Sequence, residues 1–68
     1  MDLKAFWNTL TRIEREDMAR EIGTSPAYLY QVGHGIRRAS PSLSRKIETV
    51  TEGAVTKEDL RPDLWEAA

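Results

Sequence analysis

The stretch SPAYLYQVGHG, residues 25–35, has no lysine, arginine, aspartate or glutamate but carries groups suited to hydrogen bonding and stacking. If it is helical and Leu29 and Val32 face inward, four other side chains face outward. These are Pro26, Ala27, Tyr30 and Gln31. A glutamine amide places a donor beside an acceptor, which fits the N7 and N6 edge of adenine, and an alanine suits a thymine methyl. The segment therefore has the chemistry of a surface that contacts DNA bases.

The positive charge that a polyanion requires lies beside this segment. Residues 24–47 carry four basic residues and no acid, whereas residues 1–23 sum to −1 and residues 48–68 to −4. The local field of the middle third is therefore positive, although the net charge of the chain is −1. We expect phosphate contacts from hydroxyl, imidazole and basic groups. The candidates are Ser25, His34, Arg37, Arg38, Ser40, Arg45 and Lys46.

Several of these side chains have an alternative use. Arg45 and Glu48 are three residues apart, a spacing at which helix side chains pair, so Arg45 either contacts DNA or forms a local ion pair. Lys46 either contacts DNA or lies on a solvated helix face. His34, between two glycines, is either a phosphate contact or an ordinary loop residue. We expect Tyr28 to pack on the first helix and not on DNA.

No residue pattern favours catalysis or a bound cofactor. The chain has no cysteine, one histidine, no glycine-rich phosphate loop and no metal-ligand spacing, so we expect no enzyme activity, no cofactor and no metal site. No apolar run approaches the roughly 18 residues of a membrane span, and the first residues lack a signal-peptide pattern. The absence of cysteine fits a reducing compartment, and we expect a cytoplasmic protein.

Side chains that cap helices recur along the chain and predict where the elements begin. Asp2 precedes a first short helix with an apolar stripe of Leu3, Phe6, Trp7 and Leu10. Thr11 and Glu14 form a capping-box pattern that opens a second helix. Two Ser-Pro pairs open further helices at Pro26, ending near Gly33, and at Pro41, ending near Thr51. Thr56 caps one last turn before Pro62.

The spacing across Gly23 predicts a helix-turn-helix unit over about residues 15–34. Ala19 is small where the two helices cross, Gly23 lies in the turn, and Leu29 and Val32 follow six and nine residues later. We further expect the second and the fourth helix each to bury one apolar side. The residues are Ile13, Met18, Ala19 and Ile22 in the second, and Leu43, Ile47 and Val50 in the fourth.

These elements predict an all-α fold of four to five short helices in a single domain, residues 1–68. The tail, residues 54–68, is acidic and carries more apolar surface than so small a domain easily buries. It either packs on the core or forms a homodimer interface. The apolar residues concerned are Val55, Leu60, Leu64 and Trp65.

The stretch EDMAREIGTSPAYLYQVGHGIRRASPSLSRKIE resembles the Cro and repressor type of phage helix-turn-helix protein. With GAVTKEDLRPDLW it is similar, over residues 2–65, to short Cro-like regulators and YdaS-type antitoxin-like proteins of prophages. The resemblance implies a lambda-repressor-like domain that binds operator DNA in the major groove as a transcription regulator, usually as a dimer. This sequence departs from the family pattern at Pro26 and Ala27, where family members commonly have polar side chains. An antitoxin-like or adaptor role in protein binding is the alternative.

Overall fold

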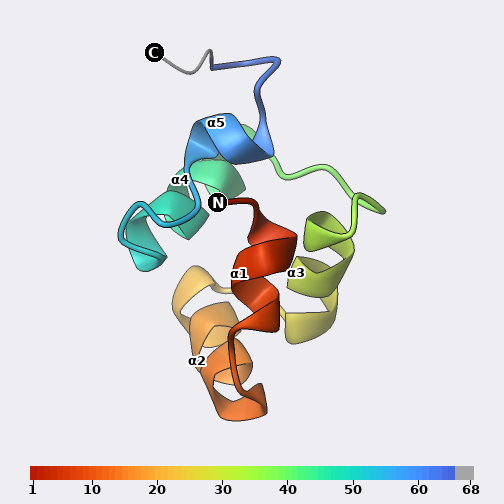
Figure 1. The fold of residues 1–68 in the computed structure, drawn as a ribbon, viewed down its shortest axis with the longest axis vertical. Coiled ribbons are helices and arrows are strands. Elements are labelled where there is room, and N and C mark those ends of the chain that lie inside the picture. The colour runs from red at the N-terminus through yellow and green to blue at the C-terminus, as the bar shows by residue number, and fades with distance from the viewer. Residues whose placement is uncertain (66–68) are drawn as a thin grey trace.

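The protein consists of five short helices in the computed structural model, which describes residues 1–65 and contains no strand within them (Figure 1). The helices are α1 (Leu3–Asn8), α2 (Arg12–Ile22), α3 (Pro26–Gly33), α4 (Pro41–Val50) and α5 (Lys57–Leu60). The prediction of a small all-α fold with four to five helices is confirmed. The most strand-like segments of the sequence, GAVT (residues 53–56) and RPDLW (residues 61–65), lie in turns and bends before and after α5.

Each helix begins at a side chain that accepts a hydrogen bond from a backbone N–H of the first turn. The five caps are Asp2, Thr11, Ser25, Ser40 and Thr56. Such a bond satisfies one of the N–H groups that have no partner within the helix. At Thr11 the capping box is complete, because the Glu14 carboxylate also accepts from the Thr11 N–H at 2.8 Å. The helix starts are thus encoded locally.

The helices share one core. α1 packs on α3, α2 contacts both α3 and α4, and α4 supports α5 (Figure 1). Every one of the first four helices contributes buried apolar residues, and two loop residues complete the set. The buried residues are Leu3, Trp7, Met18, Ala19, Ile22, Leu29, Val32, Ala39, Ile47 and Val55. None of the helices within residues 1–65 is long and apolar enough to cross a membrane.

The prediction that Ile13 of α2 belongs to the core is wrong. Met18, Ala19 and Ile22 are buried as predicted, but Ile13 is 70% exposed. Ile13 and Ile22 are nine residues apart, or two and a half helical turns, so their side chains point to opposite sides of α2. Ile13 therefore lies on the solvent side of a helix whose other three apolar residues face the core.

Helix α4 buries a polar residue that the apolar pattern does not indicate. Ile47 is fully buried as expected, whereas Leu43 and Val50 are half-buried against the core. Ser44 is also fully buried, and its hydroxyl donates to the Ser40 carbonyl at 2.9 Å. A small side chain that bonds to its own helix can be buried without an unpaired polar group.

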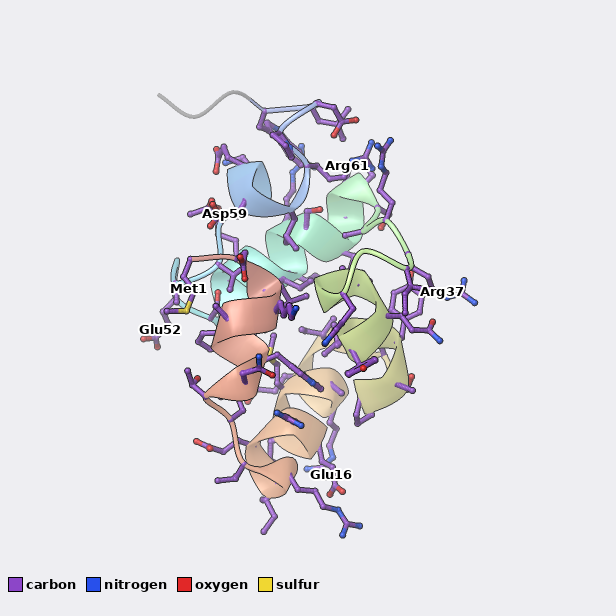
Figure 2. The ribbon with its side chains drawn as sticks, turned by 45° about the vertical axis from the view of Figure 1, so that its right-hand side comes forward. Met1, Glu16, Arg37, Glu52, Asp59 and Arg61 are labelled. Carbon is purple, nitrogen blue, oxygen red and sulfur yellow. The ribbon has the colours of Figure 1, made fainter. Side chains whose placement is uncertain are left out.

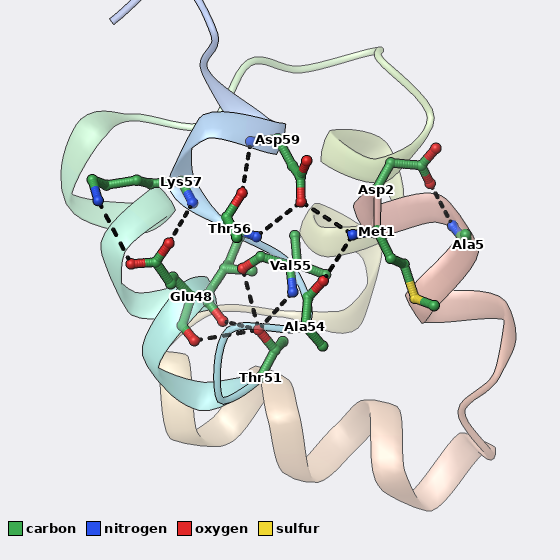
Figure 3. Close-up of polar contacts among 11 residues, drawn as sticks. Met1, Asp2, Ala5, Glu48, Thr51, Ala54, Val55, Thr56, Lys57 and Asp59 are labelled. Atoms are coloured by element: carbon green, nitrogen blue, oxygen red, sulfur yellow. Dashed lines mark hydrogen bonds and ion pairs between the residues drawn. The ribbon is translucent and has the colours of Figure 1, made fainter. Parts of the chain in front are cut away.

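The start of the tail, residues 54–59, contacts the N-terminus at Met1 and helix α4 at Glu48 (Figure 3). Val55 is fully buried and Leu60 packs against the core, whereas Leu64 is 47% exposed. Trp65 lies near two cations, 5.5 Å from the Arg45 guanidinium and 5.9 Å from the Lys57 ammonium. Val55 thus belongs to the core of its own chain and is not available to a partner. The final part of the tail, residues 66–68, lies outside the described residues.

Candidate nucleic-acid interface

The turn between α2 and α3 has the geometry that the sequence predicts. Gly23 adopts a left-handed conformation with φ of 87°, which costs a glycine little. The N–H groups of Gly23 and Thr24 both donate to the Ala19 carbonyl at 2.9 Å, and Ala19 itself is buried. This pair of bonds ends α2 and turns the chain directly into the cap of α3. The two helices therefore form a helix-turn-helix unit.

Helix α3 exposes the side that was predicted to face outward. Leu29 and Val32 are buried, Pro26 and Ala27 are exposed, and Tyr30 is 48% exposed. Gln31 is half-buried at the edge of this side. We call the exposed and half-buried residues Pro26, Ala27, Tyr30 and Gln31 the α3 face. Its first half carries little polar chemistry, because Pro26 and Ala27 have no side-chain donor or acceptor.

The cap of α3 leaves one donor available. The Ser25 hydroxyl oxygen accepts from the Tyr28 N–H at 3.1 Å. A hydroxyl can accept and donate at the same time, so the Ser25 hydrogen remains able to donate to a phosphate oxygen. Because the oxygen is held by the helix, this donor has a fixed position at the start of the α3 face.

Tyr30 and His34 form one stacked unit. Their ring centroids are 3.9 Å apart with 23° between the ring planes. The His34 Nδ1 atom lies 2.9 Å from the Tyr30 carbonyl oxygen, a distance at which a protonated Nδ1 donates to it. His34 is thus the C-cap of α3 and supports the exposed tyrosine, so it is more than a loop residue. With Nδ1 donating to the Tyr30 carbonyl, the outer Nε2 atom of the neutral ring is an acceptor, and only the imidazolium form has an Nε2–H group that can donate to a phosphate.

Gln31 and Arg37 are directly bonded. The Arg37 Nε donates to the Gln31 Oε1 at 2.6 Å, and the guanidinium lies 5.6 Å from the centre of the Tyr28 ring. Figure 2 shows Arg37 beside α3, projecting away from the core. Tyr28 is half-buried against the core, as its expected packing role requires. The structure thus joins a candidate base contact to a candidate phosphate contact.

The remaining basic candidates lie farther along the chain. Arg38 is 71% exposed and forms an exposed ion pair with Asp63 at 3.7 Å. Such pairs contribute little to stability, so they leave an arginine available to another anion. Arg45 and Lys46 are exposed on α4 and line a shallow depression with the end of α2. The predicted alternative partner of Arg45 is engaged elsewhere, because Glu48 bonds to Lys57 (Figure 3).

Two arginines that sequence reasoning missed lie beside the α3 face. A groove of about 330 Å³ separates the starts of α2 and α3, and its lining includes Arg12, Arg15, Pro26, Ala27 and Tyr30. Arg15 donates two hydrogen bonds to the Trp7 carbonyl, at 3.0 and 3.1 Å, which fixes its guanidinium there. Charge counted along the chain hides this proximity, because residues 1–23 sum to −1. The signal was the position of both arginines in the first turns of α2.

The carboxylates with shifted pKa values lie outside the α3 face and have structural causes. The backbone N–H of Thr11 lowers the pKa of Glu14, and that of Thr56 lowers the pKa of Asp59. Both are capping bonds to the ionised form. Within residues 1–65, no three His, Asp or Glu side chains gather in a way that could hold a metal ion.

Two comparisons with known proteins bear on this arrangement. The model of a family described as "Bacterial toxin YdaS" matches residues 14–68, which include most of α2 and all of α3, α4 and α5. A protein of Escherichia coli (strain K12) named "Prophage transcriptional regulatory protein" is 43% identical over 63 residues. The match covers 93% of this chain and 96% of that protein. The similarity therefore extends over nearly the whole of both chains.

Proposed function

Because this chain belongs to the YdaS family, and a relative of nearly equal length is named as a prophage regulator, we propose that it regulates prophage transcription by binding operator DNA. One observation carries the proposal. Gly23 makes the turn of a helix-turn-helix unit, and this unit leaves the α3 face exposed. In such units the second helix enters the major groove and its outward side chains meet base edges.

In this proposal the α3 face reads bases. Gln31 supplies the amide for hydrogen bonding, Tyr30 supplies a ring and a hydroxyl, and Pro26 and Ala27 give apolar contact with thymine methyl groups. The half of α3 nearest the cap thus recognises shape and methyl groups, and Gln31 carries most of the hydrogen-bond specificity. The α3 face of one protomer therefore discriminates between few base pairs.

The phosphate contacts surround this face. Hydroxyl donors at the starts of α3 and α4 and basic groups in the loop between them position the duplex. We assign this role to Ser25, His34, Arg37, Arg38, Ser40, Arg45 and Lys46. Arg12 and Arg15 add positive charge on the other side of α3, which is partly offset by Glu16, the partner of Arg12 at 3.2 Å in the same groove. Three of the acids, Glu14, Asp17 and Glu21, line a groove that contains no residue of α3, so the field beside α3 is more positive than the net charge indicates.

A second copy supplies the specificity that one α3 face lacks. We propose a homodimer in which the tail, through Leu64 and Trp65, meets its equivalent across a two-fold axis. Such a dimer places two α3 helices about 34 Å apart, one turn of DNA, on a palindromic operator. Leu60 borders this surface, and Val55 supports it from the core.

A titration tests the function. The full-length protein is titrated against the DNA upstream of its own gene and against random duplex, at 50 and 200 mM salt. Four basic phosphate contacts predict a slope of log K against log salt of about −4 per protomer, which is roughly a hundredfold loss of affinity over this range. No binding at micromolar protein and low salt, or equal affinity for both duplexes, contradicts the proposal.

Two alanine variants separate the assigned roles. Arg38→Ala removes a phosphate contact, so it should weaken binding to all duplexes and reduce the salt slope by about 1. Gln31→Ala removes a base contact, so it should mainly relax the preference at one base pair. The opposite pattern would refute the division between base and phosphate contacts.

The family description, which names a toxin, is compatible with a second candidate, an antitoxin-like or adaptor role directed at a protein. A groove of about 220 Å³ on residues of α1, α2 and the end of α4 includes Phe6, Leu10, Met18 and Val50, with carboxylates on α2. None of its lining residues belongs to α3.

Growth of cells expressing the protein separates the two roles. If the protein affects growth by binding DNA, the effect should be lost in Arg38→Ala and kept in Leu10→Glu. If the effect is kept in Arg38→Ala and lost in Leu10→Glu, protein binding is favoured.

A further inference from the structure

The bond between Arg37 and Gln31 decides how the glutamine amide is turned. A guanidinium has N–H donors and no acceptor, so the group that faces it must be the amide oxygen. The 2.6 Å contact between Arg37 Nε and Gln31 Oε1 therefore directs the amide NH2 group away from Arg37. This orientation follows from the chemistry of the partner.

Arg37 is held in this position by its backbone and by its side chain. The N–H groups of Ile36 and Arg37 donate to the Gln31 carbonyl at 2.9 and 3.3 Å, so the chain after α3 folds back over the last turn. The guanidinium also lies over the ring of Tyr28, which packs against the core. A cation over an aromatic ring is attracted to it, and this limits the arginine to one side of α3. Gln31 and Arg37 thus form a preassembled pair.

We propose that Arg37 is a positioning residue that determines which base Gln31 contacts, so that guanine is preferred over adenine. This inference rests on the proposed function. An unrestrained glutamine pairs with adenine by donating to N7 and accepting from N6. In the pair, the oxygen already accepts from Arg37, and the exposed part of the amide is a donor. Guanine offers two acceptors, N7 and O6, in the major groove.

The electrostatics of the pair act in the same direction. The amide oxygen has a second lone pair, but an adenine amino group that used it would bring a donor against the positive guanidinium. Guanine O6 carries partial negative charge and is attracted to the same guanidinium. Within residues 1–65, the remaining guanidinium N–H groups of Arg37 have no hydrogen-bond partner, so they can donate to a phosphate or to guanine. Gln31 and Arg37 together form a donor-rich surface.

Selection of binding sites from a pool of random duplexes tests this inference. We expect the wild-type protein to select guanine at one position, and Arg37→Ala to change that position to adenine, because the amide oxygen is released. On two duplexes that differ only at this base pair, the ratio of affinities should change by about tenfold, the scale of one bidentate contact. Gln31→Glu keeps an acceptor for Arg37 but has no donor, so it should lose the guanine preference.

Arg38→Ala is the matched control, since it removes the same charge from the neighbouring exposed residue. It should weaken binding to both duplexes equally and keep the selected base. Circular dichroism checks that each variant is folded. Adenine selected by the wild-type protein, or the same base selected by the wild-type protein and Arg37→Ala, would overturn the inference while the proposed function stands. A wild-type protein without any sequence preference would instead refute the proposed function.

Discussion

Gly23 is the residue on which the relation between α2 and α3 depends. Its φ of 87° lies in the region that is strained for residues with a Cβ, and the turn it makes brings Ser25 into place as the cap of α3. A Cβ added at Gly23 would meet no atom within 4 Å. The constraint at this position is therefore one of backbone conformation and not of space.

Substitution of Gly23 measures this constraint. We expect Gly23→Ala to lower the free energy of unfolding by about 1 kcal/mol, the cost of a left-handed alanine. Gly23→Asn should lower it less, since asparagine tolerates this conformation better. Denaturation with urea gives both values. An alanine variant as stable as the wild-type protein would show that the turn relaxes to another conformation.

Asp63 provides a prediction on pH. Two hydrogen bonds from Arg61, both 2.9 Å, stabilise the ionised carboxylate and lower the pKa of Asp63 from its ordinary value of 3.8 to about 2, with a smaller contribution from Arg38. A lowered folded-state pKa stabilises the fold above pH 4, and this contribution is lost as the pH falls toward 2. In a carboxyl NMR titration, Arg61→Lys should raise the pKa of Asp63 more than Arg38→Ala does. The reverse order would contradict this assignment.

Single residues with a backbone role could be predicted from the sequence, but side-chain pairs could not. Gly23 and Ser25 were assigned from local spacing alone, and the structure confirms their conformations. The bonds of Arg37 to Gln31 and of Arg15 to the Trp7 carbonyl depend on how loops and helices meet. Sequence separation gives no signal for such contacts.

At the scale of elements, the helix starts were predictable because their caps are local. The packing of α4 was less so, since Ser44 is buried where periodicity indicates only apolar residues. The end of α4 shows the same effect at Thr51, whose buried hydroxyl donates to the Ile47 carbonyl at 2.8 Å and accepts from the Val55 N–H at 3.1 Å (Figure 3). This hydroxyl joins α4 to the turn that carries Val55 into the core.

Thr51→Val tests that connection. Valine preserves the shape of threonine but leaves the buried Val55 N–H without a partner, so we expect a loss of about 1–3 kcal/mol in the free energy of unfolding. Thr51→Ser keeps the hydroxyl and removes one methyl group, and should cost about 1 kcal/mol. Thermal or urea unfolding compares them. A valine variant more stable than the serine variant would show that the hydrogen bonds contribute less than the methyl group.

At the scale of the whole molecule, the net charge of −1 conceals how charge is distributed. Three acids of α2, Glu14, Asp17 and Glu21, line the groove with Leu10. Arg12 and Arg15 lie beside α3, together with Glu16, which pairs with Arg12. The sequence indicated a positive middle third but could not assign the charges of α2 to separate surfaces, because that requires the rotation of the helix relative to α3. The α3 face was predictable, and its surroundings were not.

The dimer proposal belongs to this scale. Sedimentation of the wild-type protein should give twice the monomer mass of 7.7 kDa at micromolar concentration. Leu64→Glu should give a monomer with unchanged stability, because Leu64 is exposed within its own chain. Ile13→Glu, which changes another exposed aliphatic residue, should remain dimeric. A Leu64→Glu dimer, or a monomeric wild-type protein, would contradict the role of the tail.

The central claim is that the α3 face enters the major groove, and an NMR titration of the labelled protein with its selected duplex tests it most directly. If α3 enters the major groove, the largest changes in amide chemical shift fall on residues 25–38, with smaller changes at the starts of α2 and α4. Leu10, Asp17 and Glu21, which line the acidic groove, should change little. Shifts concentrated in that groove, with α3 unaffected, would show that α3 does not enter the major groove.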